Sequence, residues 1–237
     1  MASTVIENYV VAYLGNDDSP DISNPIHSTE VAKSYGFTGP LVGGVTVWGW
    51  ATDTILEALG EGWLQEGWAE YSFRQPVYPG DTLLIRAALD ASADSESWDV
   101  EMINQAREVC VSGKVGNGRA DWFRELIRPS HMEPVDESPA KGPLTLENAQ
   151  PGKDWSAAKL DLSEQECREF TTDKQHTDNP LFLGARAIAH PSWIAGWAEK
   201  LMRHNFEIPT SMHTRSWVQH LSKIPTGTTV TGGAHLI

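Results

Sequence analysis

Residues 71–87 read YSFRQPVYPGDTLLIRA, and residues 218–234 read VQHLSKIPTGTTVTGGA. Each stretch is typical of a strand, a turn that contains proline and glycine, and a second strand. The two stretches lie 147 residues apart, and this shift places Gly80 on Gly227 and brings a threonine into register two residues after each glycine. The matched residues in matched contexts indicate that one structural unit occurs twice in the chain.

The same shift aligns two helix-like segments. Gly49-Trp50-Ala51 falls on Gly196-Trp197-Ala198 without a gap. The segments around these triplets, Gly44–Leu59 and Ser192–Phe206, carry apolar residues over most of their circumference. This pattern predicts two long helices that are buried on most of their faces. Upstream, the dipeptides at 24–25 and 179–180 are both Asn-Pro, so the second copy is about eight residues shorter there.

The first copy predicts an α+β fold, in which an antiparallel sheet wraps around its helix. Its strands are predicted at Ala69–Arg74, Thr82–Ala91, Ser97–Asn104 and Glu108–Val115. The second copy reaches Ile237 before the last strands of that series, so we expect its sheet to be incomplete. An uncovered sheet edge promotes aggregation. We therefore expect either a homodimer in which a second subunit covers the incomplete sheet, or a chain that is a truncated form of a longer protein.

These patterns divide the chain into three parts. The first unit is predicted at residues 1–127 and the second, incomplete unit at residues 158–237. Residues 128–157 are rich in proline, glutamate, lysine and glycine and show no periodicity. This composition predicts a linker or a surface crossover.

Composition excludes several classes of function. The chain has 237 residues and a net charge of -14, which argues against nucleic acid or an anionic membrane as the main partner. A small anionic ligand held by a few local cations stays compatible with this charge. The absence of a long apolar run or a secretion signal predicts a cytoplasmic protein that does not span a membrane. Cys110 and Cys167 have no metal-binding or redox spacing, and no metal or cofactor is expected.

Two stretches of the first copy resemble the MaoC-like dehydratases, a family of hot-dog proteins that includes (R)-specific enoyl-CoA hydratases. They are NPIHSTEVAKSYGFTGPLVGGVTVWGW at residues 24–50 and FRQPVYPGDTL at residues 73–83. The family motif runs Asp-x-Asn-Pro-x-His, followed by Gly-Pro and by His-Gly at the start of the central helix. Here Asn-Pro-Ile-His at residues 24–27 matches the motif, and Gly43-Gly44 stands where His-Gly is expected. The resemblance implies a double hot-dog fold, with two central helices wrapped by antiparallel sheets, and a second unit that lacks its last strands.

The resemblance also implies a site for hydration or dehydration of an acyl thioester in the first unit only, with CoA as the expected carrier. His27 is the candidate general acid or base, and Asp21 is its candidate helper. The family's acid position holds Ile22 here, so Asp21 lies one residue further from the histidine. In the second copy Phe182 occupies the histidine position.

Substrate binding is assigned to Asn24, Gly43 and Gly44. Glycines at a helix start let an acyl group approach backbone N–H groups that stabilise negative charge on the thioester oxygen. Asn24 would orient the turn or a bound water. Gly43 and Gly44 are equally compatible with a need for tight packing between helix and strand.

Two other functions stay open from the sequence. An acyl-CoA thioesterase on the same fold would need a carboxylate on the central helix, and Asp53 and Glu57 are the acids placed for that. A non-catalytic module that binds an acyl group or a partner subunit is favoured by the irregular Asp21 spacing and by Phe182.

Most other histidines and tryptophans are expected to be structural. His190 is expected to cap or pack at the second helix, and His213 and His220 are placed on a strand. His176 with Asp178 has the composition of an acid–base pair, but lies in the copy without the motif histidine. Core packing is expected for the tryptophans of the two helices, with a role in lining an acyl channel as the alternative: Trp48, Trp50, Trp193 and Trp197.

Overall fold

The computed structural model describes residues 4–15, 24–90, 96–137 and 142–237. Its strands are β1 (Val5–Val11), β2 (Trp68–Phe73), β3 (Thr82–Leu89), β4 (Ser97–Ile103), β5 (Val109–Gly116), β6 (Gly142–Pro143), β7 (Ala158–Leu162), β8 (Phe206–Glu207), β9 (Arg215–Gln219) and β10 (Thr228–Gly232). The four strands predicted in the first copy are confirmed as β2 to β5, whereas β1 and β7 had no counterpart in the prediction.

The helices are short. They are η1 (Pro25–His27), α1 (Thr29–Ser34), α2 (Gly44–Gly49), α3 (Thr52–Leu59), α4 (Trp63–Glu66), η2 (Asp121–Glu125), α5 (Leu146–Ala149), α6 (Glu164–Glu169), η3 (Phe170–Gln175, a π-helical turn), α7 (Pro180–Leu183), α8 (Pro191–Ala195) and α9 (Trp197–Asn205). None of the helices in the described ranges is long and apolar enough to cross a membrane.

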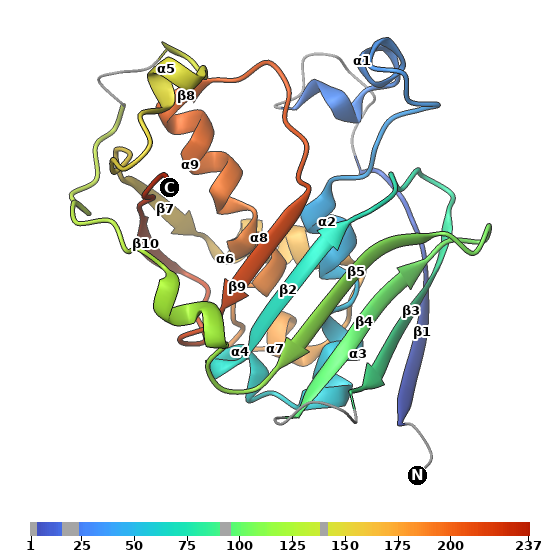
Figure 1. Ribbon diagram of the computed structural model, residues 1–237. Helices are drawn as coiled ribbons and strands as arrows, with labels where there is room; N and C mark the ends of the chain where they lie inside the picture. The colour runs from blue at the N-terminus through green and yellow to red at the C-terminus, as the bar shows by residue number, and fades with distance from the viewer. Residues whose placement is uncertain (1–3, 16–23, 91–95, 138–141) are drawn as a thin grey trace.

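A six-stranded antiparallel sheet joins the two copies. Its order is β1-β3-β4-β5-β2-β9, so five strands come from the first copy and the last one comes from the second (Figure 1). β9 pairs with β2 in a regular antiparallel register from Trp68–Gln219 to Ser72–Arg215. The edge of the first sheet is therefore extended by the strand that corresponds to β2 in the second copy.

The remaining strands of the second copy form a separate pair. β10 pairs with β7 as β3 pairs with β1, antiparallel in both cases. Within the described residues, no strand follows β10 in the chain, and no strand pairs with both β10 and β9 to join them into one sheet. The second copy thus has counterparts of β1, β2 and β3, and none of β4 and β5. This arrangement is the double hot-dog fold that the sequence predicts, with its second unit lacking the last strands.

The two predicted long helices are each divided, which corrects the sequence prediction. α2 ends at Gly49 and α3 begins at Thr52, and Ala51 N–H donates to the carbonyl oxygen of Trp48 at 2.9 Å. This bond to the third preceding residue tightens the turn and interrupts the α-helical ladder. The second copy repeats the break between α8 and α9 at Gly196, whose N–H is shared between two carbonyl oxygens.

The predicted crossover, residues 128–157, is not wholly irregular, since it contains β6 and α5. β6 lies parallel to β8 of the second copy, and Pro134 bridges to Ala157. The helix η2 just before it carries Trp122, which stacks on Trp217 of β9 at 5.7 Å between ring centroids. The unit boundaries at 127 and 158 stay predictions.

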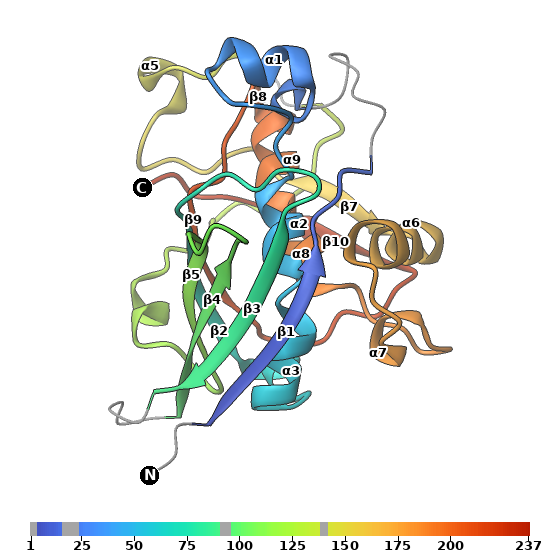
Figure 2. The same ribbon diagram turned by 90° about the vertical axis from the view of Figure 1, so that its right-hand side faces the viewer.

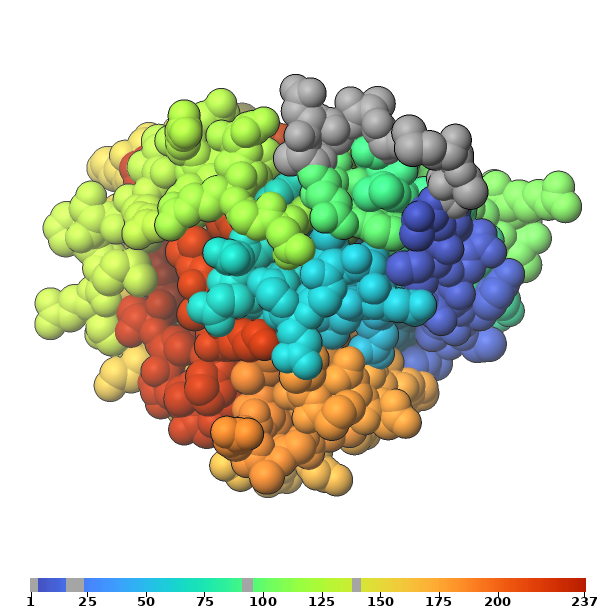
Figure 3. Space-filling model, turned by 90° about the horizontal axis from the view of Figure 1, so that it is seen from below, coloured from blue at the N-terminus to red at the C-terminus, as the bar shows by residue number. Residues whose placement is uncertain are grey.

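The core consists of two hydrophobic clusters around the helices, one in each copy, and Phe182 of the second copy belongs to the cluster of the first. Figure 2 shows the long sheet nearly edge-on with α2 and α3 beside it, and α8 packs against α2. From below, segments of the second copy pack directly against residues near position 50 of the first (Figure 3). Trp48 and Trp50 are both buried, as are Trp193 and Trp197, which confirms core packing for these four rings.

Candidate functional site

A large cavity lies between the two copies where their helices begin. Its volume is about 1020 Å³, and its wall includes His27, Gly43 and Gly44 at the start of α2, the end of β2 and much of α8 and α9. Ligand pockets of this size hold drug-sized molecules with most of their surface buried. The aromatic and aliphatic part of the wall comes from both copies: Phe37, Phe73, Trp155, Leu160, Phe170, Trp193, Trp197 and Met202. Two of the four helix tryptophans therefore line the cavity as well as packing in the core.

His27 ends the short helix η1 that the Asn-Pro turn begins. Its Nδ1 lies 2.7 Å from the carbonyl oxygen of Leu41, and because a carbonyl only accepts, Nδ1 carries the proton. Nε2 is then the acceptor nitrogen of the neutral ring. Burial lowers the pKa of His27 below 6.5, although the Leu41 carbonyl opposes this effect. A neutral imidazole with Nε2 as a proton acceptor is suited to act as a general base.

Gly43 brings the start of α2 next to this ring. A Cβ atom at Gly43 would lie 3.5 Å from Cε1 of His27 and 3.6 Å from its Nε2, so the imidazole sits against the backbone there. Gly43 is the N-cap of α2, and the first N–H groups of a helix have no acceptor within the helix. His27 and the start of α2 are thus brought together as the sequence predicts.

Gly44 has a packing role of its own. A Cβ atom at this position would lie 2.9 Å from Cζ of Phe73 and 3.2 Å from Cβ of His213. The packing explanation therefore applies to Gly44, while Gly43 has room for a methyl group.

Asn24 uses its side chain to hold the second copy. Its Nδ2 donates to the carbonyl oxygen of Ser211 at 2.9 Å and to the hydroxyl of Ser211 at 3.2 Å. In return, the N–H of Ser211 donates to Oδ1 of Asn24 at 3.3 Å. These bonds fit the expected role of orienting the turn, and they occupy the amide that would otherwise bind a water.

Asp21 and Ile22 lie outside the described residues. The carboxylate that the structure does place on the cavity wall is Glu199 of α9. Its charge raises the pKa of His27, against the larger effect of burial. Glu199 could not be predicted from the sequence, because no motif contains it and it belongs to the other copy.

The equivalent region of the second copy has lost this arrangement. Phe182 is buried in the place of the motif histidine, with its ring 4.6 Å from that of His190. His190 caps α8, since its side chain accepts from the N–H of Ser192, and burial lowers its pKa to about 3. The expectation that His190 caps and packs is confirmed.

Asp53 and Glu57 line a different and smaller cavity of about 300 Å³, together with His176 and His190. Asp53 already accepts a bond of 2.6 Å from Thr177 and one of 2.8 Å from Asn179. Asn179 belongs to the second Asn-Pro turn, so this turn binds helix α3 of the first copy, whereas the first Asn-Pro turn binds Ser211 in a loop of the second copy. Neither acid lines the cavity that contains His27.

The positions of two other histidines correct the prediction that they lie on a strand. His213 precedes β9 in a loop, and His220 follows it. His213 lines the large cavity, packs 5.2 Å from the ring of Phe73 and is hydrogen-bonded to Ser216. Burial lowers the pKa of both rings. His176 stacks on Tyr13 with 3.6 Å between the ring centroids.

No protein-family model and no curated protein matches the sequence. Solved structures do match in fold. A putative MaoC domain protein dehydratase from Chloroflexus aurantiacus aligns with 98% of this chain and 79% of its own, at 16% identity and a TM-score of 0.62. A conserved hypothetical protein from Mycobacterium tuberculosis, described as a double hot-dog fold, aligns with 99% and 84% at 13% identity and a TM-score of 0.56.

A structure described as a MaoC-like dehydratase aligns with 89% of this chain and 79% of its own, at 16% identity and a TM-score of 0.53. The chain therefore has the double hot-dog fold, and the solved structures that share it include MaoC-like dehydratases. At these identities the likeness concerns the fold alone, so the function rests on the site.

Proposed function

We propose that this protein is a hydratase or dehydratase that acts on an acyl thioester at the single site beside His27. The observation that carries the proposal is the position of His27, whose ring lies against Gly43 at the start of α2, on the wall of a largely apolar cavity. The similar solved structures described as MaoC-like dehydratases support the same class of reaction.

The residues of the site can perform each step of hydration. Nε2 of His27 takes a proton from water while the water oxygen bonds to the β-carbon of the enoyl group. Electrons of the double bond move to the thioester oxygen, where the N–H groups at the start of α2 stabilise the negative charge. The imidazolium then returns a proton to the α-carbon, and dehydration follows the same steps in reverse.

The cavity suits a bulky acyl group on an anionic carrier. Its volume of about 1020 Å³ and its aromatic wall favour a long or ring-containing chain over a short one. Arg74, Lys200 and Arg215 also line the cavity, in a chain whose net charge is -14. These cations supply local attraction for the phosphates of a CoA thioester, the carrier that we propose.

The thioesterase alternative is less well supported, because Asp53 and Glu57 lie on another cavity and Asp53 is held by Thr177 and Asn179. Release of free CoA without a hydrated product would favour it. A purely acyl-binding module would show binding without turnover.

The test is the hydration of 2-enoyl-CoA substrates of increasing chain length, measured as the loss of the conjugated enoyl group. His27→Ala should lower turnover by at least about 100-fold, since a general base contributes about 100- to 10,000-fold. His131→Ala is the matched control, because the side chain of His131 is 91% exposed. Circular dichroism establishes that both variants are folded. Turnover that His27→Ala leaves unchanged would contradict the proposal.

A further inference from the structure

Glu199 is a charged residue of the second copy on the wall of the cavity that contains His27. It lies in the first turns of α9, and its side chain is 39% exposed. The sequence motif of the first copy offers no carboxylate at the expected position, since Ile22 is found there. Glu199 therefore raises the question of whether the opposite copy supplies that charge.

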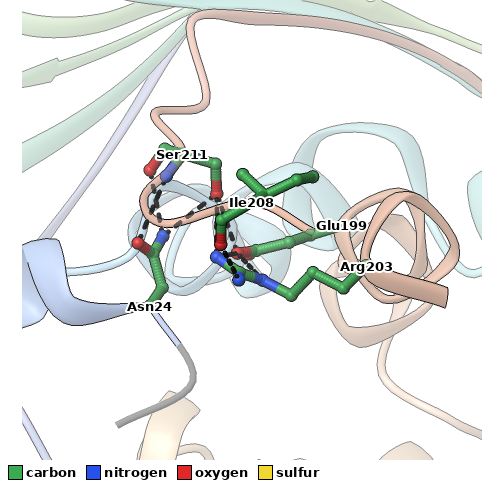
Figure 4. Close-up of polar contacts among 5 residues, drawn as sticks. All are labelled: Asn24, Glu199, Arg203, Ile208 and Ser211. Carbon is green, nitrogen blue, oxygen red and sulfur yellow. Dashed lines mark hydrogen bonds and ion pairs between the residues drawn. The ribbon is translucent and has the colours of Figure 1, made fainter. Parts of the chain in front are cut away.

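A continuous series of hydrogen bonds connects His27 with Glu199. The N–H of His27 donates to the carbonyl oxygen of Asn24 at 3.1 Å. The side chain of Asn24 binds Ser211, and the hydroxyl of Ser211 donates to Oε1 of Glu199 at 2.8 Å (Figure 4). The carboxylate is thus fixed relative to the turn that carries the histidine.

Arg203 binds the same oxygen of the Glu199 carboxylate. Its Nε and its Nη2 both lie 3.0 Å from Oε1 of Glu199, and its Nη1 donates to the carbonyl oxygen of Ile208 at 2.9 Å (Figure 4). Ser211 and Arg203 thus both donate to Oε1, and these bonds fix the position of the carboxylate. No hydrogen bond to Oε2 is present within the described ranges.

We propose that Glu199 is a positioning residue for His27: it fixes the Asn-Pro turn through Ser211, and its negative charge stabilises the imidazolium that His27 forms. The reaction part rests on the proposed hydratase function, whereas the electrostatic part concerns the free protein. Glu199 itself takes no proton. The proton that leaves water goes to Nε2 of His27 and from there to the α-carbon.

The charges around His27 determine the direction in which its pKa should change when one of them is removed. Burial is the largest effect and lowers the pKa of His27, and the Leu41 carbonyl and Glu199 raise it. Lys174 and Arg203 lower it. Removal of the Glu199 charge removes an effect that raises the pKa of His27 and leaves the lowering effect of Arg203 in place, so the pKa of His27 should fall. Removal of the Arg203 charge acts in the opposite direction.

The test is a titration of the His27 ring by NMR in the free protein, with the signal assigned from its loss in His27→Gln. Glu199→Gln keeps an oxygen acceptor and removes the charge, and it should lower the midpoint by about one pH unit. Arg203→Met should raise the midpoint. Glu207→Gln, an exposed acid eight residues after Glu199, is the matched control and should leave the midpoint unchanged.

A midpoint that Glu199→Gln leaves unchanged would overturn the proposal. A shift in the same direction in Glu199→Gln and Arg203→Met would do the same, because a general loss of structure does not distinguish the two signs. Where hydration is measurable, the acidic limb of kcat/KM should move with the NMR midpoint. If the unmodified protein hydrates no enoyl thioester, the proposed function fails, and the NMR titration still decides the role of Glu199.

Discussion

His27 is partly buried and His190 is fully buried. Both are neutral histidines near a helix start, yet their surroundings give them different capabilities. Nδ1 of His27 donates to Leu41, and the ring lines the large cavity. Nδ1 of His190 instead accepts from Ser192 at the first turn of α8, and burial is the cause of its lowered pKa. His27 is therefore available for proton transfer, whereas His190 contributes to the fold.

Acidification should destabilise the protein through His190. Burial lowers the pKa of His190 from 6.5 to about 3, so between these values the unfolded chain binds a proton that the folded chain does not. The free energy of unfolding should therefore fall as the pH is lowered from about 6.5 to about 4, by about 1.4 kcal/mol per pH unit for each such histidine. Urea unfolding at a series of pH values measures this slope.

The variant His190→Asn separates His190 from other titrating groups. Asparagine keeps an N-cap oxygen but does not titrate. The slope of the free energy of unfolding against pH should therefore decrease by the contribution of about one proton. His131→Asn, at an exposed position, should leave the slope unchanged. An equal slope in the unmodified protein and in His190→Asn would show that His190 does not titrate on unfolding.

At the residue scale, the sequence identified those contacts that a local motif contains. The motif Asn-Pro-Ile-His led to His27, and its proximity to Gly43 followed from the resemblance. Asn24 and Ser211 are 187 residues apart in the chain, and no pattern in the sequence predicts their contact. Glu199 was missed for the same reason, since its relation to His27 exists only after the two copies have packed.

At the scale of elements, the start of α2 shows two adjacent glycines with different functions. Gly43 has ordinary space around a hypothetical Cβ, which would be 3.5 Å from the nearest atom of His27. Gly44 has no such space, because Phe73 of β2 lies against it. The sequence left packing and charge stabilisation open for both glycines, since this distinction depends on where a strand far along the chain places its ring.

Gly44→Ala should destabilise the protein, whereas Gly43→Ala should not. The added methyl group at Gly44 would lie 2.9 Å from Cζ of Phe73, so the ring or the helix must move. Overpacking of this kind costs about 1–3 kcal/mol. Gly43→Ala should change the free energy of unfolding by less than about 0.5 kcal/mol, as expected where no buried contact is lost. Chemical denaturation compares the two variants, and equal effects would contradict the assignment.

The helices also show the limit of periodicity. Gly44–Leu59 and Ser192–Phe206 read as continuous helices, because apolar residues continue through both breaks. The breaks fall at the same place in both copies, next to the matched Gly-Trp-Ala triplets. The identical residues therefore reveal the repeat. Only the packed structure shows that these residues allow two bent helices to approach each other closely.

At the scale of the whole molecule, the two copies depend on each other through Gly49. A Cβ atom at Gly49 of α2 would collide with the amide of Gln175 and the hydroxyl of Ser192, both from the second copy. The sheet is shared in the same way, since β9 completes it beside β2. We therefore expect the copies to unfold together, with coincident transitions by circular dichroism and by tryptophan fluorescence.

Gly49→Ala should lower the stability of the whole molecule in this single transition. Alanine gains about 1 kcal/mol of helix propensity over glycine, but overpacking costs about 1–3 kcal/mol, and here two side chains must move. We expect a net loss, which Gln175→Ala in the same chain should partly restore by making room. Gly62→Ala is the control, because its Cβ would meet no atom within 4 Å. A Gly49→Ala variant as stable as the control, or one that splits the transition in two, would contradict the dependence of the two copies on this contact.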